Sequence, residues 1–288
     1  MTKIGLALGG GGARGAAHIG VLMELERLGI RPSLITGTSI GGIIGALVAF
    51  GLRTDDLKAL FKYFTVGNIY GLPGGTAALS TNTKIEKILQ DAIGRPTFAD
   101  LKIPLALVTT DLVTRKEVIL DEGDLIEAVL ATMALPVIFP PVKRGKHILA
   151  DGGMLNNVPF DIARARGATY VIAVSLSNSA PYGTPIEESA PPPDVISRAL
   201  AFTKRRPTLQ ILSVITDIWS DVTLRTRLAL TQPEILLEPD MGTIGIFDTH
   251  RLDEGVQAGQ QAVRAVEARL LADLDLINSE LEDTHTNL

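Results

Sequence analysis

The stretch SLITGTSIGGIIGALVAFG, residues 33–51, joins two apolar runs through a turn rich in glycine. Its first half is typical of a short buried strand, and residues 40–51 are typical of a helix that is apolar on every side because it is buried. The stretch belongs to 21 uncharged residues between Arg31 and Arg53, which is long enough to span a bilayer. Five glycines and the break at GTSIGG favour a strand, a tight turn and a helix over a transmembrane segment.

Strands and helices alternate on both sides of this unit, as in a single α/β domain over residues 1–288. The expected strands are 3–8, 33–39, 105–112, 116–123, 147–151, 169–177 and 234–240, with the third and fourth paired as a hairpin. The expected helices are 13–28, 40–51, 54–64, 82–93, 123–134, 194–230 and 251–274. Nothing in the pattern requires a second domain.

Composition narrows the class of protein. The 288 residues are 46% hydrophobic and 20% charged, which is ordinary for a globular protein. A net charge of -5 argues against nucleic acid as a partner, because nucleic-acid binding usually needs a basic face. The absence of cysteine excludes disulfides, thiolate zinc sites and cysteine nucleophiles. The N-terminal residues do not resemble a signal peptide, so we expect a cytoplasmic protein.

A glycine-rich loop, GGGGARGAAHIG at residues 9–20, follows the first expected strand. Its G-x-G-x-x-G spacing is that of a dinucleotide-binding loop, which also needs an acidic residue about 20 positions later. No Asp or Glu occurs from Arg31 to Arg53, and Ala16 and Ala17 stand where a phosphate-binding loop needs Lys and Ser or Thr. Both nucleotide interpretations therefore fail.

The sequence GTSIG at residues 37–41 instead matches G-x-S-x-G. This pattern places a serine on a sharp strand-to-helix turn, where Gly37 and Gly41 would relieve the crowding. We therefore predict Ser39 to be a nucleophile; the alternative is a serine that only caps the helix.

The two glycine-containing turns follow neighbouring strands, so in a parallel sheet they would lie at the same edge. We expect the backbone amides of Gly10, Gly11 and Gly12 to face the carbonyl that Ser39 attacks and to bind the resulting oxyanion. Arg14 would support this loop or the developing charge; it is equally compatible with an ordinary surface arginine.

The serine needs a base, and none of the four histidines lies in a distinctive motif. Asp151 ends a buried strand and is followed by Gly152 and Gly153, which leave space around its carboxylate. Seclusion from water would raise the basicity of this group. The alternative role for Asp151 is to order the following turn.

Together, GGGGARG, GTSIG and DGG resemble the patatin-like phospholipase family, in its short bacterial branch related to the catalytic domain of neuropathy target esterase. Residues 131–141 and 244–259 extend the resemblance. It implies a three-layer α/β/α hydrolase fold with a mostly parallel sheet. It also implies a Ser39–Asp151 dyad without histidine, an oxyanion hole at Gly10, Gly11 and Gly12, and no metal or organic cofactor. The implied substrates are lipid esters such as phospholipids, lysophospholipids or acylglycerols.

Thr132 stands where a serine is frequent in the family, and we expect this departure not to touch the chemistry. Two rival interpretations stay open: an esterase with a Ser39–Asp151–His250 triad, and a non-catalytic regulator that retains the fold.

A loop or membrane-facing segment is expected over 178–230. Residues 178–193 form either a lid or a connector. Residues 198–230 combine basic with apolar side chains, which suits contact with an anionic membrane surface, packing on the core or a dimer contact. A frayed tail is expected over 276–288.

Overall fold

The computed structural model describes residues 2–63, 82–177 and 207–286, with only the backbone described at 207–210 and 276–286. The strands are β1 (Ile4–Leu8), β2 (Leu34–Thr38), β3 (Leu105–Asp111), β4 (Lys116–Leu120), β5 (Val142–Arg144), β6 (His147–Asp151), β7 (Tyr170–Val174) and β8 (Ile235–Leu237). The α-helices are α1 (Ala16–Arg27), α2 (Ile40–Phe50), α3 (Thr54–Phe61), α5 (Thr83–Ile93), α6 (Leu125–Thr132), α7 (Phe160–Ala165), α9 (Pro207–Leu228) and α10 (Leu252–Thr286).

The described strands form one eight-stranded sheet in the order β5-β6-β3-β2-β1-β7-β8, with β4 paired to β3. The neighbours along β3-β2-β1-β7-β8 are parallel, whereas β4, β5 and β6 add antiparallel pairs at one end of the sheet. The predicted mostly parallel sheet and the hairpin of β3 with β4 are therefore confirmed.

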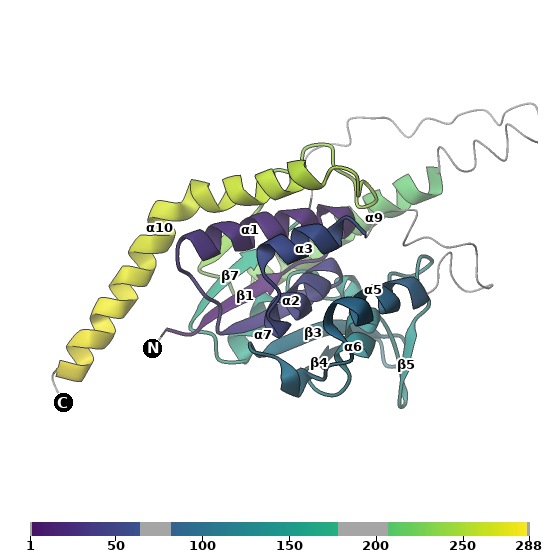
Figure 1. The fold of residues 1–288 in the computed structure, drawn as a ribbon, viewed down its shortest axis with the longest axis horizontal. Helices are drawn as coiled ribbons and strands as arrows, with labels where there is room; N and C mark the ends of the chain where they lie inside the picture. Colours follow the sequence, from purple (N-terminus) through teal and green to yellow (C-terminus); the bar gives the residue numbers. More distant parts are fainter. Residues whose placement is uncertain (1, 64–81, 178–206, 287–288) are drawn as a thin grey trace, which may run out of the picture.

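Helices cover both faces of the sheet, which makes three layers (Figure 1). The alternation along β1 explains this arrangement, because successive side chains of a strand point to opposite faces. Leu6 and Leu8 belong to a core cluster with residues of α1, α2, α6 and α10. Ala7, between them, packs in a second cluster with Phe160 of α7 and Leu224 of α9.

Helix α10 begins close to the glycine-rich loop and runs along α1 before extending past the rest of the domain (Figure 1). The two helices pack at glycines: a Cβ atom on Gly20 would lie 2.0 Å from the carbonyl oxygen of Val256, and one on Gly259 equally close to that of Ala17. Helix α10 continues to Thr286, so the expected helix end near Leu274 is wrong. No Gly or Pro interrupts the chain after Gly259 in this helix.

The strand–turn–helix unit predicted for 33–51 is confirmed as β2 and α2. The short elements β5 and α7 escaped prediction, because three and six residues are too few to show a periodicity. The helix expected from Ala13 starts with a 3-10 turn at Gly12–Gly15. Residues 178–206, with the expected lid, lie outside the described residues. No helix in the described part of the chain is sufficiently long and apolar to cross a bilayer.

Candidate active site

The register of the sheet brings Ser39 and Asp151 together. Thr38, the last residue of β2, is paired with Val108 of β3, and Asp151, the last residue of β6, is paired with the next residue, Thr109. At both positions β4 pairs with one edge of β3, so β2 and β6 both pair with the opposite edge. β2 pairs with the first part of β3 and β6 with its last part, and the two strands therefore meet end to end. The hydroxyl of Ser39, which follows Thr38, donates a hydrogen bond to the Asp151 carboxylate.

Ser39 lies on a sharp turn with a strained backbone. Its φ of 55° and ψ of -124° are unusual for a residue with a side chain. The flanking glycines make the turn feasible: a Cβ on Gly37 would lie 2.7 Å from the carbonyl oxygen of Gly41, and a Cβ on Gly41 would lie 2.2 Å from that of Leu8. The half-buried serine is therefore held at the N-terminus of α2, as the G-x-S-x-G pattern predicts.

Thr132, at the end of α6, holds this turn from the side. Its hydroxyl accepts a hydrogen bond from the Ser39 amide at 3.1 Å and donates one to the carbonyl oxygen of Val108 at 2.5 Å. Thr132 therefore contacts the backbone of Ser39 through a hydroxyl that a serine would also carry, and the expectation that this departure leaves the chemistry untouched stays a prediction. Sequence spacing could not show the contact, since 93 positions separate the two residues.

Asp151 is buried, with 4% of its surface exposed. Burial raises the pKa of its carboxyl group to about 6, although hydrogen bonds from the Ser39 hydroxyl and the Gly153 amide act in the opposite direction. The Gly153 amide lies 2.8 Å from Oδ1 of Asp151. Gly152 packs against β3, because a Cβ there would lie 2.3 Å from the carbonyl oxygen of Val108.

The glycine-rich loop lies beside the serine, but its three predicted donors are not equivalent. The Gly10 amide donates to the carbonyl oxygen of Asn157 at 3.1 Å, and Nδ2 of Asn157 donates to the carbonyl oxygen of Gly10 at 3.3 Å. Within the described residues, the amides of Gly11 and Gly12 have no protein acceptor. These two amides are free to bind an oxyanion, whereas Gly10 joins the loop to the segment after Asp151.

Arg14 supports this loop from behind. It is 1% exposed, its guanidinium pairs with Asp217 of α9, and its Nε donates to the carbonyl oxygen of Ile244 at 2.7 Å. The interpretation as a surface arginine is therefore wrong. Neither Asn157 nor Asp217 emerged from the sequence, because each acts through a contact with a residue more than a hundred positions away.

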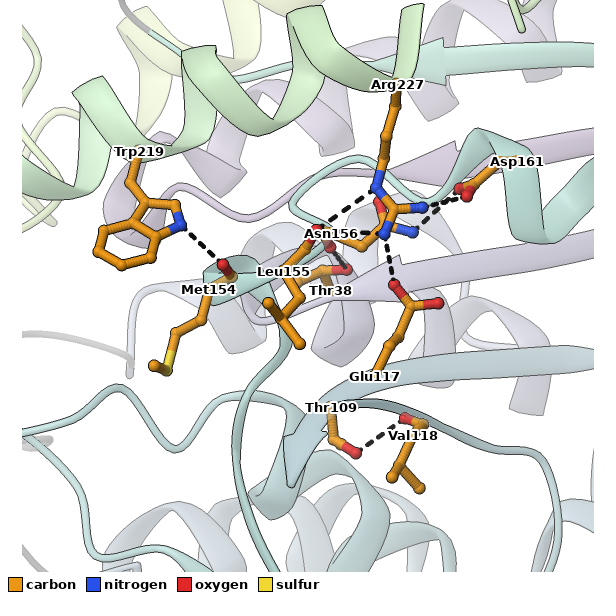
Figure 2. Close-up of polar contacts among 10 residues, drawn as sticks. All are labelled: Thr38, Thr109, Glu117, Val118, Met154, Leu155, Asn156, Asp161, Trp219 and Arg227. Atoms are coloured by element: carbon orange, nitrogen blue, oxygen red, sulfur yellow. Dashed lines mark hydrogen bonds and ion pairs between the residues drawn. The ribbon is translucent and has the colours of Figure 1, made fainter. Parts of the chain in front are cut away.

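Helix α9 also holds the segment that follows Asp151 (Figure 2). Nε1 of Trp219 donates to the carbonyl oxygen of Met154 at 2.7 Å, and Arg227 donates to that of Leu155 at 3.2 Å. Arg227 also pairs with Asp161 and with Glu117, whose pKa is raised chiefly by burial.

A cavity of about 300 Å³ opens onto Ser39, Asp151 and the glycine-rich loop. The rest of its wall is mainly apolar and comes from several elements: Ile43, Phe61, Ile85, Met133, Phe139 and Leu212. An apolar wall with a few polar groups at one end suits an acyl chain with an ester at its head.

The described histidines do not complete a triad. Asp151 is bonded by Ser39 itself and by Gly153, and no described histidine side chain bonds to it. His18 is buried in α1, where Nε2 donates to the carbonyl oxygen of Gly9 at 2.7 Å and burial lowers its pKa to about 4. His147 bonds to Asp111, and His250 is exposed. In the described part of the chain, no group of three metal-binding side chains is clustered.

The chain is similar to known proteins. The family model described as patatin-like phospholipase matches residues 6–164. The chain is 32% identical over 286 residues to an uncharacterized NTE family protein of Mycobacterium tuberculosis, covering 96% of this chain and 48% of that protein. It is 36% identical over 189 residues to human patatin-like phospholipase domain-containing protein 6, covering 62% of this chain and 14% of that protein.

The chain thus spans about half the length or less of these curated relatives. Among solved structures, VipD from Legionella pneumophila aligns with a TM-score of 0.51 at 14% identity, covering 92% of this chain and 67% of that one. This likeness concerns the fold alone.

Proposed function

Since the chain belongs to the patatin-like phospholipase family, we propose that it is a serine hydrolase that cleaves carboxylic esters of lipids with Ser39 and Asp151. The observation that carries the proposal is the hydrogen bond between the Ser39 hydroxyl and the buried Asp151 carboxylate, at the junction of β2 and β6. A carboxylate with a pKa of about 6 is ionised at neutral pH and is more basic than an ordinary aspartate.

These contacts support the following reaction. Asp151 accepts the proton of Ser39 while the serine oxygen attacks the ester carbonyl, and the amides of Gly11 and Gly12 bind the oxyanion. Asp151 then gives its proton to the departing alcohol, which leaves an acyl-enzyme on Ser39. A water molecule that gives a proton to Asp151 attacks that ester, and Asp151 passes the proton to the serine oxygen as the fatty acid leaves, which restores both residues.

The apolar cavity supports a long-chain acyl group as the part of the substrate that is bound. Phospholipids, lysophospholipids and acylglycerols all carry such a group, and they are the substrates that the proposal covers. Action in the cytoplasm with a peripheral membrane contact is part of the same proposal, and α9 is the described element that bears on it.

The test is covalent labelling of the purified protein with a fluorophosphonate, which reacts with activated serines. We expect labelling of the wild type, none of Ser39→Ala, and strongly reduced labelling of Asp151→Asn. His250→Ala is the matched control and should label like the wild type.

Equal labelling of Asp151→Asn would break the dyad, and loss of labelling in His250→Ala would establish the triad. A folded wild-type protein that does not label at all would favour a non-catalytic regulator.

A further inference from the structure

Helix α9 packs on the domain through its more polar face, which is the reverse of an ordinary surface helix. The face that packs on the domain carries Ser213, Asp217, Ser220, Leu224 and Arg227, most of them polar, and the partly buried Leu212 and Leu228 also pack against the core. The opposite face carries large apolar side chains that are between 42% and 60% exposed: Ile211, Ile215, Ile218, Trp219 and Val222. A surface helix normally buries its apolar stripe and exposes its polar one. We refer to these five exposed residues as the apolar stripe.

Polar contacts hold the helix in this orientation. Asp217 pairs with buried Arg14, and both its oxygens are used, at 2.5 and 2.9 Å from the two terminal nitrogens. Arg227 and Trp219 bond to the segment after Asp151, as Figure 2 shows. Rotating α9 to bury the apolar stripe would leave Arg14 buried without a counter-charge, which is strongly unfavourable. The stripe is therefore exposed because the contacts of Asp217 and Arg227 occupy the inner face, while Trp219, at the edge of the stripe, adds its bond to Met154.

The apolar stripe reaches the mouth of the active-site cavity. Ile215 and Trp219 belong to the stripe and also line the cavity. A second element contributes in the same way: Val137 lines the cavity and is 56% exposed. Its φ of 74° is strained for a β-branched residue, and such strain concentrates at functional sites. Exposed apolar side chains of α9 and of the turn between α6 and β5 thus line the same cavity.

Each charged side chain that is described in α9 has an oppositely charged partner. Asp221 and Arg225 pair with each other, while Asp217 and Arg227 pair with residues of the domain. The expected attraction to an anionic surface thus finds no support in Arg225 and Arg227. The other basic residues of that expectation, Arg198 and 204–206, lie outside the described residues.

We propose that the apolar stripe and Val137 form a docking surface for the phospholipid bilayer, from which the substrate of the proposed function passes into the cavity. Burying apolar side chains in the acyl region of a bilayer is favourable, and an indole with a bonded N–H suits the interface. A protein partner or a second copy on the stripe would cover Ile215 and Trp219 at the cavity mouth. A bilayer would instead deliver its own acyl chains there without exposing them to water.

Trp219 is the only tryptophan in the sequence and reports directly on this surface. The Ser39→Ala variant, which cannot hydrolyse lipid in the proposed mechanism, is titrated with vesicles of phosphatidylcholine, a lipid without net charge. We expect a blue shift of the tryptophan emission and quenching by acyl chains brominated near the headgroup. An emission spectrum that does not respond to vesicles would overturn the proposal.

A pair of double variants tests the stripe in particular. Ile218→Ser with Val222→Ser changes two stripe residues that do not line the cavity. Leu112→Ser with Val113→Ser is the matched control, because these residues are comparably exposed on the turn between β3 and β4. In the Ser39→Ala background we expect vesicle affinity to fall at least about tenfold in the first variant and to stay unchanged in the control.

With Ser39 intact, both double variants should hydrolyse a soluble short-chain ester at the wild-type rate, since the cavity is untouched. Equal loss of vesicle binding in both would overturn the proposal. So would sedimentation showing a dimer that only the stripe variant dissociates, because the stripe would then be a contact between copies. Vesicle binding without hydrolysis of any ester would instead refute the proposed function and leave the docking surface in place.

Discussion

Asp217 on α9 and Arg14 beside the glycine-rich loop form a doubly bonded ion pair across 203 positions of sequence. The side chain of Arg14 is 1% exposed and that of Asp217 is 14% exposed, so water screens the pair little. The contact ties the helix with the apolar stripe to the loop that carries the proposed oxyanion donors.

Asp217→Asn should therefore destabilise the protein by about 3 kcal/mol or more, because it leaves the Arg14 charge buried without its partner. Urea denaturation measures the free energy of unfolding. Asp221→Asn is the matched control on the same helix, where an exposed pair with Arg225 is lost and little change is expected. Equal stability of the two variants would show that the Arg14 pair has no special structural role.

Thr132→Val should lower kcat about tenfold or more. Valine has nearly the same shape, but it cannot accept the hydrogen bond from the Ser39 amide, and a lost bond of this kind costs about 1–3 kcal/mol. Thr132→Ser keeps the hydroxyl and should retain most of the activity. The measurement is steady-state hydrolysis of a short-chain ester; a serine variant as impaired as the valine variant would point to packing instead.

Ser39→Gly should be more stable than Ser39→Ala by about 1 kcal/mol, although both lack the nucleophile. Glycine relieves a backbone strain of about 1–3 kcal/mol at a positive φ, less the entropy that it loses on folding. Alanine keeps the Cβ and hence the strain. Thermal or urea unfolding of the two inactive variants compares them directly, and a less stable glycine variant would argue against strain at the turn.

The pH dependence of kcat/KM should show an acidic limb centred near pH 6. Below the raised pKa of about 6, Asp151 is protonated and cannot accept the serine proton, so activity falls as the pH decreases. An ordinary aspartate would place this limb near pH 4. The profile is measured with a soluble ester whose own chemistry does not titrate in this range. A flat profile from pH 4 to 8 would remove Asp151 from the role of base.

The local elements of the site could be predicted because their signals lie within a few residues. The G-x-S-x-G turn between an apolar strand and an apolar helix needs no distant partner to be recognised, and β2, Ser39 and α2 follow it as expected. The same holds for the strand that ends at Asp151. Short elements such as β5 and the true end of α10 carried weaker local signals and were missed or misplaced.

By itself, the sequence determined where the chain turns and which residues are candidates for the chemistry, because glycines, strand periodicity and helix periodicity act locally. Only the tertiary structure decided which groups meet. β6 enters antiparallel on the edge of β3 that β2 leaves, so Asp151 reaches Ser39. The carbonyl oxygen of Asn157 accepts the hydrogen bond of the Gly10 amide. The ion pair between buried Arg14 and Asp217 holds α9 with its apolar face outward. These outcomes depend on pairing between segments that are distant in the sequence, such as Gly10 with Asn157 and Arg14 with Asp217, and no local pattern encodes such pairing.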